Sequence, residues 1–449
     1  MSGYAEYREV NLPWLKAVPA HWEIRRNKNI FTEQKEIVGE RSADYTLLSL
    51  TLNGIIPRDM DGGGKFPESF DKYKIVKNGD MAFCLFDIDE TPRTVGMSGY
   101  NGMLTGAYTI MRVSNINARF IYYYYLALDN GKMLRPLYTG LRKTININTF
   151  QSTKVPVPPR GEQDQIVRFL DWKVSSINKL IRIRKRRIEE LEAIKRSSIG
   201  YLVMGQTQSI PQRGTAISWV KTIPAHWNEK SLIQVAEEQQ IKNAGMVEDN
   251  LLSLSYGKII NKDIKTTDGL LPSSFEGYQI VHDGNIILRL TDLQNDHKSL
   301  RTGLVTQTGI ITSAYTCLKV RCNILPEYLQ LQLHVADLCK VFYGMGGGVR
   351  QSIGFKEIRK LVIAIPPVEE QQHILDRVHI IEKPINCAIQ NSRDIIAELE
   401  NLKMRLISDT VTGKIDVRGI EIPEYEFVDE DADADNEDDG EEDTEEQED

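Results

Sequence analysis

The chain has 449 residues, 41% of them hydrophobic and 26% charged, which predicts a soluble protein of two to four domains. No apolar run approaches the roughly 20 residues needed to cross a bilayer, and the first residues lack a basic-then-apolar leader, so we expect a cytoplasmic protein with no membrane contact. Five scattered cysteines without a Cys-x-x-Cys pair predict a reduced protein without zinc.

The net charge of −8 is unevenly distributed. Residues 429–449 contain 15 acidic side chains and no Lys or Arg, whereas the first 428 residues hold 55 basic and 48 acidic side chains, a net charge of about +7. The sequence therefore predicts a mildly basic folded body, compatible with nucleic acid, and an acidic tail over residues 419–449 that is disordered.

An internal repeat with a period of 205 to 208 residues organises the chain. Residues 14–22 (WLKAVPAHW) return as residues 219–227 (WVKTIPAHW). Further matches follow in the same order, among them LLSL at 47–50 and 251–254, and AYT at 107–109 and 314–316. A period of this length describes a whole domain with its following helix and not a solenoid repeat.

The first part of each repeat is predicted to be mostly β-structure. In the first copy, the short runs 46–50, 81–85 and 108–113 are rich in strand-forming residues. Asn78-Gly79 and Asp283-Gly284 lie between apolar runs and predict hairpin turns. Helices are expected over 119–128 and 146–152, and in the second copy over 327–338 and 355–360. Each copy is therefore predicted to be a small α+β domain.

Two long helices are predicted after the two domains. Residues 162–204 and the stretch that follows Pro366-Pro367 repeat an apolar residue every three or four positions, which predicts coiled-coil helices. Each begins with a Pro-Pro pair followed by Glu-Gln, and the acidic residue suits the positive end of a helix. We expect the helices to pair through a seam that includes Ile177, Leu191, Ile385, Ile395, Leu399 and Leu402.

These elements predict five segments. The first domain covers residues 1–160 and the first spacer helix 161–205, after which a short polar linker opens the second domain, residues 206–367. The second spacer helix covers 368–418, its helical part ending at Thr412-Gly413, and the acidic tail covers 419–449.

Several catalytic motifs are absent from the sequence. It contains no Gly-x-x-x-x-Gly-Lys-Ser/Thr loop, no Asn- or Asp-Pro-Pro-aromatic motif of amino-methyltransferases, no His-Glu-x-x-His and no Gly-x-Ser-x-Gly. These absences argue against ATP hydrolysis, methyl transfer and the corresponding hydrolase classes. Scattered Asp, Glu and Lys residues leave a nuclease site open.

Two loops at equivalent repeat positions are candidates for phosphate binding. Residues 138–144 (YTGLRKT) and 344–352 (GMGGGVRQS) each combine Gly with an Arg, and free amides and a guanidinium both favour an anion. The alternative is a flexible surface loop with an incidental Arg. The candidate DNA-binding residues are Lys65, which ends a Gly-rich stretch of the first copy, and Arg142, Lys143, Thr144, Arg350, Gln351 and Ser352.

Three further patterns have two interpretations each. His21 and His226 could be catalytic, but we expect Trp22 and Trp227 to dock into the domains and carry the histidines with them. The aromatic run 122–125 could stack on bases, or it could pack against the domain as part of an amphipathic helix. The basic cluster 182–187 could contact DNA or form a solvated helix face.

These features together resemble the specificity subunit of Type I restriction–modification enzymes. In that family each target-recognition domain opens with Pro-x-x-Trp, here residues 19–22 and 224–227, and closes with a Pro-rich strand that runs into a helix marked Glu-Gln. Residues 411–418 (VTGKIDVR) are similar to the family's end of the second helix, whereas VMGQ at the end of the first keeps only Val203 and Gly205.

The resemblance implies an α+β fold with two similar mixed α/β target-recognition domains, joined by two long antiparallel coiled-coil helices. It implies a non-catalytic subunit whose domains each read one half of a bipartite, asymmetric target in double-stranded DNA. The helices would set the gap and dock two methyltransferase subunits, which restriction subunits then join. S-adenosylmethionine, ATP and Mg²⁺ would belong to those partners, and none to this chain. The alternative is a standalone two-domain DNA-binding or coiled-coil scaffold protein without methyltransferase partners.

Overall fold

The computed structural model describes residues 2–58, 67, 69–138, 143–206, 209–263, 274–293, 300–321, 323–345 and 352–429. The chain divides into two compact units, one built from residues 1–186 and 392–440 and the other from residues 187–391 and 441–449. Each unit therefore combines one domain with the first part of one long helix and the last part of the other.

The domain of the first unit is built from short antiparallel strands. Its largest sheet has the order β4 (Phe31–Gln34), β11 (Thr109–Val113), β8 (Met81–Phe83), β9 (Val95–Met97). Four two-stranded ladders accompany it: β1 (Tyr7–Leu12) with β2 (Leu15–Pro19), β3 (Glu23–Arg26) with β12 (Lys154–Val157), β5 (Leu48–Thr51) with β6 (Gly54–Pro57), and β7 (Lys74–Val76) with β10 (Gly102–Leu104). Helices α1 (Ala118–Asn130) and α2 (Ile147–Ser152) close a core in which Phe83 contacts the rings of Tyr125 and Phe150.

The domain of the second unit repeats these sheet orders and ladders, with a third strand added to one ladder and one additional short helix. Its four-stranded sheet has the order β16 (Ala236–Gln239), β24 (Thr316–Val320), β21 (Ile286–Leu288), β22 (Thr302–Leu304). The ladders are β13 (Gln212–Gly214) with β14 (Thr222–Pro224), β15 (Asn228–Ser231) with β25 (Val362–Ile365), β18 (Leu252–Ser255) with β19 (Lys258–Asn261), and β17 (Ile241–Lys242), β20 (Gln279–Val281) and β23 (Gly309–Ile311) in one sheet. The helices are α4 (Leu232–Val235), α5 (Pro326–Leu338) and α6 (Phe355–Ile358). The predicted pair of similar α+β domains is confirmed.

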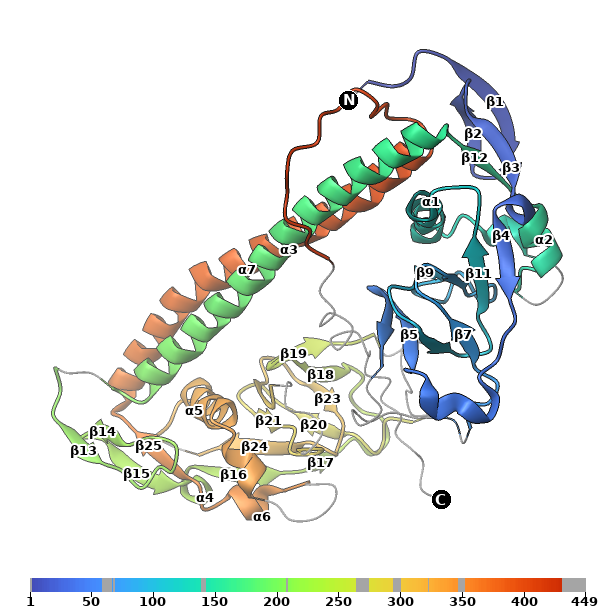
Figure 1. The fold of residues 1–449 in the computed structure, drawn as a ribbon. Helices are drawn as coiled ribbons and strands as arrows, with labels where there is room; N and C mark the ends of the chain where they lie inside the picture. The colour runs from blue at the N-terminus through green and yellow to red at the C-terminus, as the bar shows by residue number, and fades with distance from the viewer. Residues whose placement is uncertain are drawn as a thin grey trace. The chain divides into compact units, whose positions relative to one another are not determined.

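Two helices of 44 residues each, α3 (Arg160–Val203) and α7 (Val368–Val411), lie side by side and antiparallel (Figure 1). In the second unit the Lys195 ammonium lies 3.1 Å from the Glu382 carboxylate. In the first unit the Lys403 ammonium donates to the Asn178 side-chain oxygen at 3.4 Å. The predicted pairing of the two long helices is confirmed. Over the described residues, no helix is long and apolar enough to cross a membrane.

The residues expected in the seam differ in their exposure. Ile177 and Leu191 of α3 are buried, and Ile385, Ile395 and Leu399 of α7 are partly buried, whereas Leu402 is 41% exposed. Near its end α7 turns Ile407 and Val411 into the core of the first domain. Leu402 lies about 140° around the helix from Ile407, because each residue advances the helix by about 100°, and so it faces outward.

The turns at Asn78-Gly79 and Asp283-Gly284 exist, but the prediction that they close hairpins is wrong. Gly79 and Gly284 have φ of +87° and +80°, as a tight turn requires. The strands on either side of each turn join different sheets: β7 pairs with β10, whereas β8 pairs with β11 and β9, and β20 and β21 are separated in the same way. An Asn-Gly signal specifies the turn, and it leaves open which sheet each flanking strand joins.

The Pro-Ala-His-Trp segments lie where each domain meets the long helices. Trp22 is 1% exposed, and its Nε1 donates to the Glu162 carboxylate at the start of α3 (2.9 Å). Gly413, just after α7, has φ of +76°, and a Cβ there would come within 2.4 Å of Pro19. Trp227 is 2% exposed, and a Cβ on Gly205, just after α3, would come within 2.6 Å of its ring. The interpretation that these tryptophans dock into the domains is confirmed.

The chain beyond α7 runs along α3. The Ser175 hydroxyl donates to the carbonyl of Glu426 (2.9 Å) and accepts from the amide of Val428 (2.7 Å), and Asn178 donates to the carbonyl of Val428 (3.2 Å). Within the predicted acidic tail, residues 419–449, the main chain of Glu426 and Val428 thus contacts α3, and residues 430–449 lie outside the described residues.

Candidate nucleic-acid interface

The candidate DNA-binding residues fall largely in segments that the structure leaves undescribed. Four of the seven lie outside the described residues: Lys65, Arg142, Arg350 and Gln351. Lys143, Thr144 and Ser352 are described, and all three stand at the edges of the two candidate phosphate loops. Ser352 is exposed, and Thr144 forms an isolated antiparallel bridge with Phe86.

Lys143 contacts carboxylates of its own domain. Its ammonium forms an ion pair with Glu90 and lies 3.4 Å from the Asp89 carboxylate. The hydrogen bond with Glu90 raises the pKa of Lys143 above its usual value. A DNA phosphate at this position would have to compete with two acidic side chains that already neutralise the ammonium.

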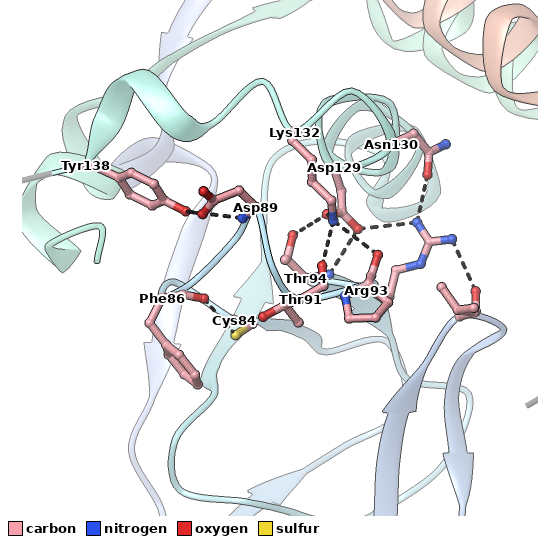
Figure 2. Close-up of polar contacts among 12 residues, drawn as sticks. Cys84, Phe86, Asp89, Thr91, Arg93, Thr94, Asp129, Asn130, Lys132 and Tyr138 are labelled. Carbon is pink, nitrogen blue, oxygen red and sulfur yellow. Dashed lines mark hydrogen bonds and ion pairs between the residues drawn. The ribbon is translucent and has the colours of Figure 1, made fainter. Parts of the chain in front are cut away.

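Those carboxylates belong to loop 87–94, which follows β8 and is held at both ends (Figure 2). At its start, the Tyr138 hydroxyl donates to the Asp89 carboxylate at 2.6 Å and lowers the pKa of that carboxyl. At its end, the Asp129 carboxylate of α1 accepts from the main-chain amide of Thr94 at 3.0 Å. Lys132 and Arg93 contact the same carboxylate, at 2.9 and 3.3 Å. Loop 87–94 is therefore anchored to α1 and to the segment that follows it.

The second domain also holds the main chain that follows its strand β21. Arg301 is fully buried, and its guanidinium donates to the main-chain carbonyls of Arg289 (3.2 Å) and Thr291 (2.7 Å). Its main-chain amide donates to the carboxylate of Asp337, the counterpart of Asp129 in α5 (2.8 Å). In both domains a cation and an aspartate hold the main chain between two neighbouring strands of the sheet: between β8 and β9 in the first domain, and between β21 and β22 in the second.

The tyrosine run of α1 is a packing feature. Tyr123, Tyr124 and Tyr125 are at most 3% exposed. Their hydroxyls bond to Asp171 (2.7 Å), to the Trp14 indole (2.9 Å) and to Asn27 (2.7 Å), in that order. The interpretation that these rings stack on bases is wrong, because they are inside the domain and on its contact with α3.

The family model of the Type I restriction modification DNA specificity domain matches the chain twice, over residues 83–193 and 304–401. Each match begins in the sheet of one domain and continues into the following long helix. Two relatives from Methanocaldococcus jannaschii match over nearly their whole length: the putative type I restriction enzyme MjaX specificity subunit (23% identity, 89% of this chain and 95% of the relative) and the type I restriction enzyme MjaVIII specificity subunit (22%, 92% and 98%). The chain belongs to the family of Type I restriction–modification specificity subunits.

A solved chain from work on complex assembly and conformational transition of the type I R-M system has the same fold as this specificity subunit. The TM-score is 0.57 at 13% identity, and the alignment covers 89% of this chain and 99% of the other. The likeness shows the fold of two domains with a long helix pair, and the two matches to the DNA specificity domain model identify the domains as DNA-recognition domains.

Sequence reasoning missed the residues that anchor the loops of this specificity subunit. Asp129 and Asp337 occupy the same repeat position, as do Lys132 and Lys340, and this coincidence near the end of a predicted helix was a usable signal. No sequence pattern indicated the role of Arg301, because its partners are main-chain carbonyls, which every residue type has. Among the described residues, no group of three His, Cys, Asp or Glu side chains is placed to hold a metal ion.

Proposed function

We propose that this specificity subunit reads a bipartite, asymmetric target in double-stranded DNA, one half with the domain of residues 1–160 and the other with the domain of residues 206–367. The duplicated framework carries this proposal. The sheets and junctions repeat, whereas loop 87–94 and its counterpart differ in sequence. Divergent loops on a common scaffold are what two readers of different base sequences need.

The spacers, residues 161–205 and 368–418, set the gap between the half-sites. A helix of 44 residues is roughly 65 Å long at about 1.5 Å per residue. That length exceeds one turn of duplex, about 34 Å, the spacing that places two readers on one face of DNA. The gap therefore depends on helix length and not on either domain.

The helices also dock two methyltransferase subunits, and restriction subunits join that complex. Large apolar side chains on α3 support a protein partner, because Leu180 and Ile183 in the first unit are 49% and 54% exposed. In this proposal the chain itself does no chemistry. S-adenosylmethionine, ATP and Mg²⁺ bind to the partner subunits. The complex works in the cytoplasm, where DNA is available.

Domain exchange tests the division of labour. Replacing residues 1–155 with the matching domain of a related subunit should change one half-site in the methylation pattern and leave the other half-site and the gap unchanged. Adding or removing turns of both helices should change the gap alone. Rewriting of both half-sites by the single exchange would refute independent reading by two domains.

Co-purification from the native cells separates this proposal from a standalone DNA-binding scaffold. The specificity subunit should bring a methyltransferase subunit with it in a stable complex. Purification of the chain alone, with sequence-specific DNA binding intact, would favour the scaffold.

A further inference from the structure

Loop 87–94 begins with a residue in the left-handed backbone region. Asp87 has φ of +43°, and Asp292, at the same repeat position of the second domain, has φ of +53°. Non-glycine residues adopt this conformation at an energetic cost, and they keep it only where surrounding contacts hold it. The residues that follow differ between the two domains, so the backbone conformation at the start of the loop is conserved between copies whose loop sequences are not.

The side chain of Lys132 holds the far part of this loop by its main chain. The ammonium donates to the carbonyls of Thr91 (2.7 Å) and Pro92 (3.1 Å) and to the carboxylate of Asp129 (2.9 Å), as Figure 2 shows. Lys132 itself has φ of +48°, an unusual conformation for Lys just after a helix. The three contacts use all three protons of the ammonium within the domain.

Asp129 is the centre of the anchor. Its side chain is 1% exposed and accepts from the amide (3.0 Å) and hydroxyl (2.5 Å) of Thr94, from Arg93 and from Lys132. Arg93 also donates to the carbonyl of Leu52 in the β5–β6 turn (3.2 Å). A buried carboxylate with this many donors is rigid, because loss of any partner leaves a polar group unpaired.

The second domain holds the start of the equivalent loop with a different cation. Its counterpart of Lys132 is Lys340, also left-handed (φ of +57°), whose ammonium lies 3.2 Å from the Tyr343 hydroxyl. Arg301 donates to the carbonyls of Arg289 and Thr291, which precede the equivalent loop, and to the carbonyl of Asp292 (3.3 Å), its first residue. In both domains a buried or half-buried cation therefore holds main-chain carbonyls at or near this loop: Lys132 at its far part in the first domain, and Arg301 at its start in the second.

We propose that Lys132 is a positioning residue for base readout, which holds loop 87–94 in the conformation that presents its side chains to the first half-site. The proposal rests on the proposed function, since it assumes that the first domain reads bases. Lys132 acts through the loop, and its ammonium is occupied by protein carbonyls and a carboxylate and not by DNA. A loop that samples several conformations would accept several bases where a fixed loop accepts one.

The test measures base preference with the complete complex of this chain and its methyltransferase. A library of DNA sites randomised within both half-sites is methylated and sequenced, using the wild type, Lys132→Met, Lys132→Arg and Lys340→Met. Thermal unfolding of each complex is measured alongside. Lys132→Met removes the charge and keeps the length of the side chain, and Lys132→Arg restores a cation. Lys340→Met is the matched control, because it makes the same change at the same repeat position of the other domain.

We expect Lys132→Met to lower discrimination within the first half-site on the order of tenfold, the scale of one lost base contact. The second half-site and the gap should be unchanged, Lys132→Arg should restore most of the discrimination, and Lys340→Met should leave the first half-site unchanged. An equal loss of methylation at all sites, or an unchanged first half-site, would overturn the inference and leave Lys132 a stabilising residue. A wild-type complex without a bipartite methylation pattern would instead refute the proposed function itself.

Discussion

The imidazole Nε2 of His21 lies 2.7 Å from the carboxylate of Glu162, 141 residues further along the chain. The same pair recurs in the second unit, where His226 lies 2.8 Å from Glu370. Each histidine comes from the Pro-Ala-His-Trp segment of a domain, and each glutamate from the first turn of the following long helix. The two repeated motifs are therefore two sides of one contact, which fixes the direction in which a helix leaves its domain.

Glu162→Ala should destabilise the first unit more than Glu370→Ala destabilises the second. Glu162 is buried and also accepts from the Tyr4 hydroxyl and the Trp22 indole, so its removal leaves buried donors unpaired, at a cost of about 2–4 kcal/mol. The Trp227 indole has no hydrogen-bond partner among the described residues, and the exposed pair of Glu370 contributes at most about 1 kcal/mol. Urea unfolding of both variants measures the difference, and equal losses would contradict this account.

The sequence predicted the elements that depend on repetition and on local pattern. The repeat of residues 14–22 at 219–227 located both domains, and the apolar period of α3 and α7 located both long helices. It also predicted that Trp22 is buried, because an aromatic residue fixed by a preceding Pro is a docking element. It did not predict the role of His21, because the partner carboxylate is supplied by folding from a distant part of the chain.

Strand pairing and loop anchoring were the parts that sequence patterns could not specify. Strands of three residues, such as β7 and β8, carry too little alternation to select a partner, and the turn between them was therefore mistaken for a hairpin. The anchor at Lys132 depends on main-chain carbonyls and on a left-handed φ at a residue type that rarely adopts it. Neither property has a signature in residue type or spacing.

A charge placed in the helix seam should act differently from a charge placed beside it. Val378 of α7 is 1% exposed and packs in the core of the second unit, whereas Ile380, two residues on, is 71% exposed. Val378→Asp should lower the free energy of unfolding by several kcal/mol, about 3 or more, because the carboxylate is buried without a partner. Ile380→Asp should change it by less than about 0.5 kcal/mol. Thermal unfolding of the two variants tests this, and similar melting temperatures would mean that the seam is not the buried face.

Acid should destabilise the second unit through His334 of α5. Burial lowers the pKa of His334 to about 4, with a smaller contribution from nearby Lys195. Between that pH and the ordinary histidine value near 6.5, the unfolded chain binds a proton that the folded chain does not, so stability falls as pH falls. Between pH 7 and 5 the loss should be about 1–2 kcal/mol. The wild type should lose more stability over this interval than His334→Gln in urea unfolding, and parallel losses would show that His334 does not contribute.

Arg142 and Lys143 are adjacent, yet they should differ in their contribution to DNA affinity. Arg142 has the repeat position of Arg350 in the candidate phosphate loops, and we propose that each guanidinium holds a backbone phosphate. Alanine at either should weaken binding to specific and non-specific duplex alike and reduce the slope of log affinity against log salt by about one unit. Lys143→Ala should change the slope less, because its ammonium is paired with Asp89 and Glu90. Binding measured from low to moderate salt decides this, and an altered base preference with an unchanged slope would show that the arginines read bases instead.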